Sequence, residues 1–359
     1  MKRLLLSFLI LICLNGCSDD EPNIAPRSSR VFDMGFTTWS YGPTLENVNE
    51  TYSFIANNSH IYSEHIDSNI PWNAWINDET LPVAFTNEIA GRVDRKILSK
   101  ERLLSVSLLN LDRDDLASDF DGTVPNYDSF DDESIRNAYF KHINFLVGEI
   151  NPEYLVIAME VNELRLKSPE KWEGYKNLIA DVKSRIKALY PELKISESVT
   201  LHNLYQPDVA NPQLYIDEIM GHVNQNDFVA ISFYPFFKNL RSKSDIQTAL
   251  DFLHTNATKK VAFVETAQLA QNLEIPNLNV SIDGSAASQT DYLEVLIENA
   301  NNQAYEFIIW WAHRDYDALW ETFPDELKDV GQIWRDTGLL DENGTERPAF
   351  TVWSESFLQ

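Results

Sequence analysis

The sequence predicts an α/β fold, a (β/α)8 TIM barrel, in a single domain over residues 31–359. Short apolar runs rich in β-branched residues alternate with segments whose apolar residues have helical spacing. There are eight such runs, the number of strands in a closed parallel barrel. An open doubly wound sheet is the alternative. It is disfavoured because no glycine-rich phosphate turn follows any of the runs.

The strands and helices are predicted as follows. The strands are residues 31–38, 60–66, 103–109, 154–164, 193–200, 228–234, 260–266 and 306–311. The main helices between and after them are residues 45–57, 131–150, 168–189, 212–223, 243–256, 288–300 and 325–336. The fourth strand is mainly an apolar run that ends in Asn162-Glu163, as expected for a parallel strand that is covered on both faces. The third helix has a serine cap followed by a proline, a combination typical of a helix start.

Residues 1–30 precede the barrel. An apolar stretch too short to span a bilayer is followed by Leu-Asn-Gly-Cys at residues 14–17, which resembles the lipobox of bacterial lipoproteins. This resemblance implies a signal peptide over residues 1–17 and a lipid on the Cys17 thiol. An ordinary secretory signal is the alternative. Residues 18–30 are polar and are predicted to be a flexible tether. We therefore expect the protein at the outer membrane or cell surface, lipid-anchored at Cys17.

The composition limits the possible partners. There are 55 acidic and 29 basic residues, for a formal net charge of -26. Such a surface does not favour binding to nucleic acid, or to a membrane except through the lipid anchor. The seven histidines lack the paired spacing of a zinc site, so no metal or other cofactor is expected. Residues 119–123 have the D-x-D-G pattern of a calcium loop but no distal glutamate, so a structural calcium is the weaker alternative to a simple turn.

Two of the predicted strands end in glutamate, Glu163 on the fourth and Glu265 on the seventh. These strands lie on opposite sides of an eight-stranded barrel, so both carboxylates are expected to point into one central cavity. Glycoside hydrolysis with retention needs an acid and a nucleophile roughly 5 Å apart, whereas inversion needs a wider gap. The sequence therefore predicts a glycoside hydrolase. Retention rather than inversion is implied by the resemblance of residues 162–163 and 264–267 to retaining enzymes.

Aromatic and polar side chains also gather at the predicted strand ends. Several tryptophans on one rim are typical of platforms for sugar rings, although each one alone is equally compatible with a core position. Polar neighbours on the same rim are suited to bind sugar hydroxyls. The predicted substrate-binding residues are Asn162, Tyr234, Trp310, Trp311, Trp39, Trp72, His65, His202 and Gln268.

Three motifs resemble clan A of the glycoside hydrolases, and within it the family 53 arabinogalactan endo-β-1,4-galactanases. These motifs are the Asn-Glu pair at residues 162–163, the segment Ile-Ser-Phe-Tyr-Pro-Phe-Phe at 231–237, and Val-Glu-Thr-Ala at 264–267. The resemblance implies that Glu163 is the acid/base and Glu265 the nucleophile. It also implies that Asn162 binds the sugar 2-hydroxyl, Tyr234 donates to Glu265, and Trp310 forms the floor of a sugar subsite.

One departure from the clan concerns the second strand. Clan members carry an arginine there that keeps the nucleophile ionised, but residues 63–67 contain none, and His65 is the candidate replacement. We expect a cell-surface enzyme that cleaves a β-linked polysaccharide or oligosaccharide. The alternative is a surface glycan-binding lipoprotein that keeps the barrel without the chemistry.

Overall fold

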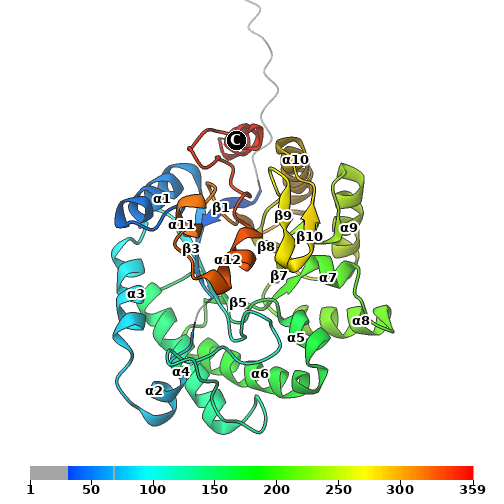
Figure 1. The fold of residues 1–359 in the computed structure, drawn as a ribbon. Coiled ribbons are helices and arrows are strands. Elements are labelled where there is room, and N and C mark those ends of the chain that lie inside the picture. Colours follow the sequence, from blue (N-terminus) through cyan, green and yellow to red (C-terminus); the bar gives the residue numbers. More distant parts are fainter. Residues whose placement is uncertain (1–30, 68, 359) are drawn as a thin grey trace, which may run out of the picture.

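A nearly closed parallel barrel forms the centre of the protein (Figure 1). The computed structural model describes residues 31–67 and 69–358. Nine parallel strands pair in the order β5-β4-β3-β2-β1-β11-β8-β7-β6. β5 and β6 are two parts of the predicted fifth strand, separated only by Glu197, so the (β/α)8 prediction is confirmed. The barrel strands are β1 (Asp33–Thr37), β2 (Ile61–Ile66), β3 (Glu101–Val106), β4 (Tyr154–Val156), β5 (Lys194–Ser196), β6 (Ser198–Thr200), β7 (Val229–Phe233), β8 (Val261–Thr266) and β11 (Phe307–Trp310).

Helices surround the barrel, as Figure 1 shows. Their apolar faces pack on the outer side of the strands and form the larger of the two cores. None of the helices between residues 31 and 358 has the length and apolar character of a membrane span. The helices around the barrel are α1 (Leu45–Asn58), α2 (Trp72–Asn77), α3 (Val83–Asp94), α4 (Glu133–Ile150), α5 (Val161–Lys167), α6 (Trp172–Leu189), α7 (Leu201–Tyr205), α8 (Pro212–Val223), α9 (Lys243–Asn256), α10 (Ala286–Gln303) and α13 (Pro348–Phe357). Three short 3-10 turns are η1 (Pro169–Lys171), η2 (Pro235–Lys238) and η3 (Pro276–Leu278), the last of which joins β9 to β10.

The fourth strand differs from its prediction. β4 ends at Val156, the backbone of Glu160 adopts a left-handed conformation with φ 55, and α5 begins at Val161. The backbone N–H of Glu160 donates to Ser198 Oγ at 2.9 Å, which fixes this turn against the fifth strand. The prediction of one strand through residue 164 was therefore wrong, and Glu163 lies in the first turn of α5.

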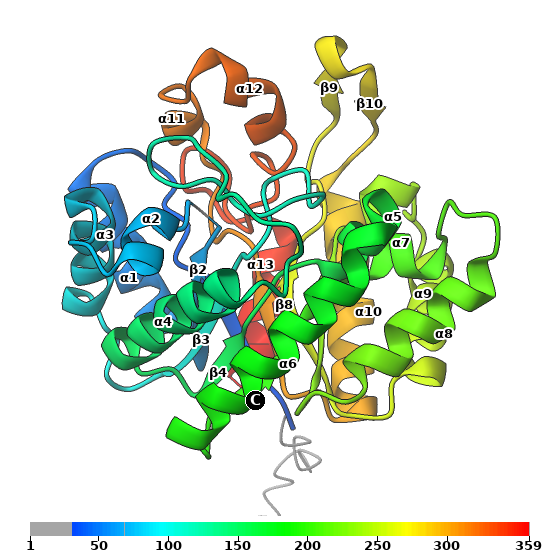
Figure 2. The same cartoon turned by 90° about the horizontal axis from the view of Figure 1, so that it is seen from below.

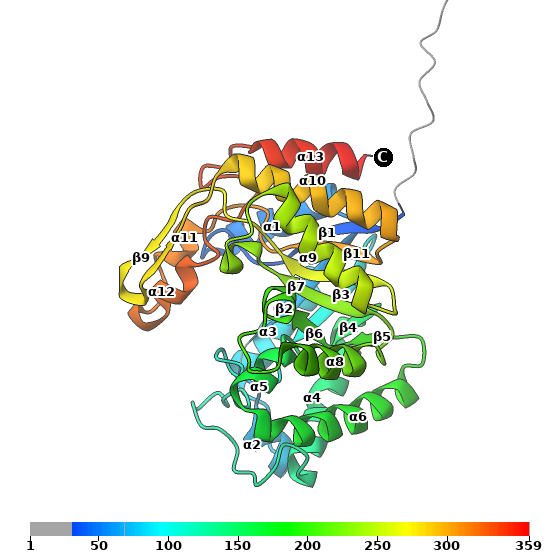
Figure 3. The same ribbon diagram turned by 90° about the vertical axis from the view of Figure 1, so that its right-hand side faces the viewer.

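An arm projects beyond the barrel at the ends of β8 and β11. It consists of the antiparallel hairpin β9 (Leu273–Ile275) and β10 (Val280–Ile282) together with α11 (Asp317–Trp320) and α12 (Asp325–Gln332). Figures 2 and 3 show both parts extending to the same side. Gln332 Nε2 donates to the carbonyl of Glu274 at 3.3 Å, so the two parts touch. The hairpin was not predicted, because its strands are short and half polar.

Candidate active site

Glu265 at the end of β8 lies at the centre of the barrel mouth. The Tyr234 hydroxyl donates to its Oε1 atom, and His65 Nδ1 lies 3.6 Å from Oε2, which is too long for a hydrogen bond. Burial lowers the pKa of His65 to about 4, so this ring is neutral at pH 7. Burial and the charge of Glu160 together raise the pKa of Glu265 to about 8. The Glu265 carboxyl group is therefore harder to ionise than an ordinary glutamate.

Glu160 is the second carboxylate of this mouth, and the sequence prediction missed it. Ser232 Oγ donates to its Oε1 atom at 2.7 Å, and Ser232 is the β7 residue paired with Glu265 in the sheet. Arg113 Nε donates to Glu160 Oε2 at 3.0 Å. The side chain of Glu160 is 18% exposed and that of Glu265 is 13% exposed, so both are largely shielded from solvent. A signal was present in the sequence, because Glu160 is the first charged residue after the apolar run that contains β4.

Glu163 faces the fifth strand and the segment that follows it. Thr200 Oγ1 donates to Glu163 Oε1, and Asn203 Nδ2 donates to the same atom at 2.7 Å. Lys167 Nζ approaches Oε2 at 3.9 Å. No hydrogen bond or ion pair joins Glu163 to Glu265 within the part of the chain that the structure describes. Its role as the acid/base stays a prediction.

Asn162 is fully buried and has no free group. Its Nδ2 donates to Thr200 Oγ1 at 2.9 Å, and its Oδ1 accepts from the Thr200 backbone N–H at 2.8 Å. These bonds hold α5 against β6. The prediction that Asn162 binds a sugar hydroxyl was therefore wrong.

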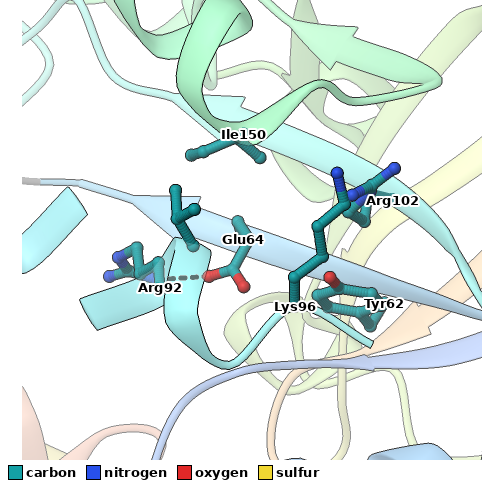
Figure 4. Close-up of a pocket in the computed structure, with 7 residues that line it drawn as sticks. Tyr62, Glu64, Arg92, Lys96, Arg102 and Ile150 are labelled. Carbon is teal, nitrogen blue, oxygen red and sulfur yellow. Dashed lines mark hydrogen bonds and ion pairs between the residues drawn. The ribbon is translucent and has the colours of Figure 1, made fainter. Parts of the chain in front are cut away.

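The positive charge of the mouth comes from Arg113, in the loop after β3. Its Nη1 and Nη2 donate to the Asp67 carboxylate at 3.1 and 2.7 Å, while its Nε holds Glu160. Arg92 of α3 is the arginine beside β2, but it pairs with Glu64 at 2.7 Å on the outer side of the strand (Figure 4). The clan's strand-two arginine is thus absent from the inner face, and a guanidinium arrives from the next loop instead.

Trp310 is the last residue of β11 and Trp311 follows it, with the two side chains on opposite sides of the barrel wall. Trp310 has no exposed surface, and its Nε1 donates to the carbonyl of Thr337 at 2.9 Å. The prediction that it floors a sugar subsite was therefore wrong. Trp311 lies inside the mouth, with ring centroids 5.0 Å from His65 and 5.2 Å from Trp39. Trp39 and Trp311 thus form the aromatic surface on the β1 side of the mouth.

Other predicted rim residues are structural. Trp72 is fully buried with its Nε1 bonded to the carbonyl of Ala117, and Gln268, 2% exposed, bonds the backbone at Leu240 and Leu269. Neither can contact a substrate, so these two predictions were wrong.

A second aromatic group lies on the β7 side of the mouth, and most of it was missed. Phe237, 38% exposed, and Trp334 both contact the ring of Tyr234, with centroids at 6.1 and 5.9 Å. Predicted His202 packs on Phe237 at 5.1 Å and is 7% exposed. Tyr234 therefore connects this second group to Glu265.

Several buried donors around the mouth have no hydrogen-bond partner among the described residues. They are the indole Nε1 atoms of Trp39, Trp311 and Trp334 and the Nδ1 atoms of His65 and His202. Buried donors are normally paired, so an unpaired group at a mouth is suited to bind an incoming hydroxyl.

Acidic groups that could hold a metal ion already have partners. Asp315, Asp317 and Asp336 offer oxygens within 4.8 Å of one another, but Arg347 pairs with Asp315 and Arg335 with the other two. In the candidate calcium loop, the Asp119 carboxylate accepts backbone N–H groups from Asn73 and Phe120, which is the bonding of a turn.

A (β/α)8 barrel with two carboxylates and aromatic rings at its strand ends has the architecture of a glycoside hydrolase. The sequence profile of glycosyl hydrolase family 53 matches residues 142–353, more than half of the chain. The chain belongs to this family, within clan A, as the resemblance predicted. No curated protein matches the sequence.

Solved structures share the fold. The GH53 catalytic domain of Ignisphaera aggregans is 17% identical, with TM-score 0.60 over 91% of this chain and 97% of that one. One of two fungal β-1,4-galactanases is 15% identical, with TM-score 0.56 over 86% and 91% of the chains. A GH5_18 protein of Bifidobacterium longum subsp. longum, in complex with Manβ1-4GlcNAc, is 14% identical, with TM-score 0.64 over 91% and 78%.

Proposed function

We propose that this protein is a retaining glycosidase in which Glu265 is the nucleophile and Glu160 the acid/base. The observation that carries the proposal is the convergence of these two buried carboxylates at the barrel mouth, linked through Ser232. In the first step Glu265 attacks the anomeric carbon, and the acid protonates the departing glycosidic oxygen. In the second step Glu160, now a base, takes a proton from a water molecule. The water oxygen attacks the anomeric carbon and releases the sugar from Glu265.

The surroundings of Glu265 support its part. Burial and the neighbouring Glu265 carboxylate raise the pKa of Tyr234 well above its usual value, so Tyr234 remains a hydrogen-bond donor at every working pH. A donor held on Oε1 stabilises the carboxylate and orients its free oxygen towards the sugar. The unpaired indole N–H groups and imidazole nitrogens on both sides are suited to bind hydroxyls of adjoining sugar units, because a hydroxyl can both donate and accept.

The proposed substrate is a neutral β-linked polysaccharide of the galactan type. Membership of family 53 supports a β-galactan, since the fungal proteins of the same fold are β-1,4-galactanases. Aromatic surfaces on two sides of the carboxylates favour binding of several sugar units and hence endo cleavage.

The decisive experiment is a reducing-sugar assay on galactan, arabinogalactan, mannan, xylan and β-1,3-glucan. Wild type is compared with Glu265→Gln, Glu160→Gln and Glu163→Gln. We expect loss of about 10³-fold or more in the first two variants and a small loss in the third. Full activity in Glu160→Gln with none in Glu163→Gln would return the acid/base role to Glu163. Proton NMR of the first product distinguishes retention from inversion.

One observation favours a second candidate, a surface glycan-binding lipoprotein. Arg113 pairs with Glu160, whereas the basic group nearest to Glu265 is the ring of His65, which is neutral at pH 7, so no lysine or arginine of the described chain forms an ion pair with the proposed nucleophile. If no glycan is cleaved and Glu265→Gln still binds one of them in a pull-down assay, binding is the function.

We also propose that a lipid on Cys17 anchors the protein at the cell surface; this residue lies outside the described part of the chain. The described chain supports the arrangement, because it enters the barrel at the amino end of β1, opposite the mouth. An anchor on that side leaves the mouth open to extracellular glycans. Loss of membrane association in Cys17→Ala, measured by cell fractionation and labelling with a fatty acid, tests it.

A further inference from the structure

Arg113 has an unusual and fully occupied position. Its backbone lies in the left-handed region with φ 58, which a non-glycine residue adopts only when surrounding contacts hold it there. Its side chain is buried, and it donates to Ser107 Oγ at 3.2 Å and to the carbonyl of Asn110 at 3.0 Å, in addition to Asp67 and Glu160. The guanidinium is therefore fixed in direction before any ligand arrives.

Asp67 orients this guanidinium. The bidentate contact between Asp67 and Arg113 uses both Nη atoms of the arginine, and its Nε donates to Glu160. Burial alone would raise the pKa of Asp67, but Arg113 holds it below the usual value, so this carboxylate stays charged. Asp67 and Arg113 thus act as one rigid unit that presents a single N–H donor to Glu160.

The charged and titratable groups around the two glutamates differ. Glu160 contacts Arg113 from the loop after β3, and its charge also acts on His65 and Tyr234. Glu265 faces His65 of β2, which is neutral at pH 7, and Tyr234 after β7, beyond which lies Tyr316. The charges of Asp67 and Arg113 act on Glu265 as well, without direct contact. Each glutamate also faces the other. Of the two glutamates, Glu160 is therefore the one in direct contact with the Arg113 guanidinium.

We propose that Arg113 is a positioning residue that keeps Glu160 as the charged member of the pair, so that their shared proton resides on Glu265 in the free protein. The raised pKa of Glu265 agrees with this arrangement. This deepens the proposed function, because the first catalytic step requires the opposite arrangement. The proton must pass from the Glu265 carboxyl to the Glu160 carboxylate when a sugar binds, with no change in the net charge of the pair.

The test is carbon-13 NMR of protein labelled at the glutamate carboxyl carbon, with the two signals assigned from Glu160→Gln and Glu265→Gln. At pH 6 without glycan we expect the Glu265 carbon in its protonated position and the Glu160 carbon in its ionised position. In Arg113→Gln the Glu160 signal should move towards the protonated position, while Arg113→Lys should keep most of the wild-type pattern. Arg165→Gln, which breaks the Arg165–Glu218 ion pair between α5 and α8, is the matched control and should change neither signal.

The wild-type spectrum already decides the main point, even if Arg113→Gln fails to fold. A protonated Glu160 and an ionised Glu265 at pH 6 would overturn the proposal, and so would signals that are the same in Arg113→Gln and wild type. The measurement needs no substrate, so it remains valid if no glycan is cleaved. Where activity is found, the pH at half-maximal rate should shift by about one unit or more in Arg113→Gln and by less in Arg113→Lys.

Discussion

Carboxylates on the outer side of the barrel wall have different partners from the Glu265 carboxylate at the mouth. On the outer side, Glu64 pairs with Arg92 at 2.7 Å, and Glu197 pairs with His222 at 2.7 Å and accepts from Tyr175 at 2.5 Å. At the mouth, Glu265 receives one tyrosine hydroxyl and faces a neutral histidine. Glu64 and Glu197 each have a basic side chain in direct contact, and such pairs belong to the fold, whereas a shielded carboxylate without a basic partner is typical of a functional site.

Neighbouring tryptophans show the same difference. The Nε1 atom of Trp310, on the outer face, is bonded to a carbonyl, and that of Trp311, on the inner face, has no partner among the described residues. Identical side chains one position apart thus serve packing and binding. The difference between packing and binding lies in the hydrogen-bond partners of each side chain rather than in the residue type. Mutation of matched residues tests it.

The largest contrast is expected between Glu197→Gln and Glu265→Gln. Glu197→Gln removes the buried charge that His222 and Tyr175 contact and leaves a neutral amide in its place, and we expect a loss of about 3–5 kcal/mol in the free energy of unfolding. Glu265→Gln removes an uncompensated carboxylate, so it should keep or increase stability at pH 8 while abolishing activity. Urea unfolding at pH 8 measures both; equal losses in the two variants would contradict the distinction.

The sequence predicted the barrel because parallel strands covered on both faces must be continuously apolar. The same rule hid Glu160, the acid/base proposed above. The first turn of α5 is also buried, from Val161 to Leu164, so apolar character extended past the end of β4 and hid the turn at Glu160. Apolarity reports burial and does not distinguish a strand from a helix that follows it directly.

Two other features depend on geometry that sequence patterns do not contain. The pairing of β11 with β8 shifts register, because β8 advances by three residues from Phe263 to Thr266 while β11 advances by two from Ile308 to Trp310. Apolar patterns do not reveal such an irregularity. Arg113 lies 46 residues from Asp67 and 47 from Glu160, and only the folded loop brings the three together. By contrast, Tyr234 and Glu265 follow apolar runs directly, and the predicted hydrogen bond between them is present.

A second contrast compares Trp310→Ala with Trp311→Ala. The first opens a cavity in the outer core and should cost about 3–5 kcal/mol of stability. The second removes a ring at the mouth and should weaken glycan binding by about 10-fold, with a smaller loss of stability. Thermal unfolding and titration calorimetry with galactan oligosaccharides separate the two effects. A stability loss in Trp311→Ala as large as that in Trp310→Ala would place Trp311 in the core instead.

The pH dependence of stability offers a third contrast. The pKa of Glu265 is raised from 4.5 to about 8, so the stability that its protonated form provides is complete below pH 4.5 and is lost as pH rises through 8. Relative to Glu265→Gln, wild type should lose up to about 1.4 kcal/mol per pH unit between pH 5 and 8. Taking the difference between the two proteins cancels the titration of groups that do not interact with Glu265. A difference that stays constant over this range would mean that Glu265 is ionised throughout.

The smallest effect is expected at the edge of the mouth, from Trp334→Ala and its matched control Trp320→Ala. Trp334 contacts Tyr234 and has an unpaired Nε1, whereas Trp320 Nε1 donates to the carbonyl of Lys328 at 2.8 Å. We expect Trp334→Ala to raise KM for long oligosaccharides by about 3- to 10-fold, in line with about 1 kcal/mol for one aromatic contact, and to leave KM for short ones unchanged. Trp320→Ala should leave both constants unchanged. Equal KM changes in the two variants would mean that an unpaired indole N–H near the mouth does not identify a sugar contact.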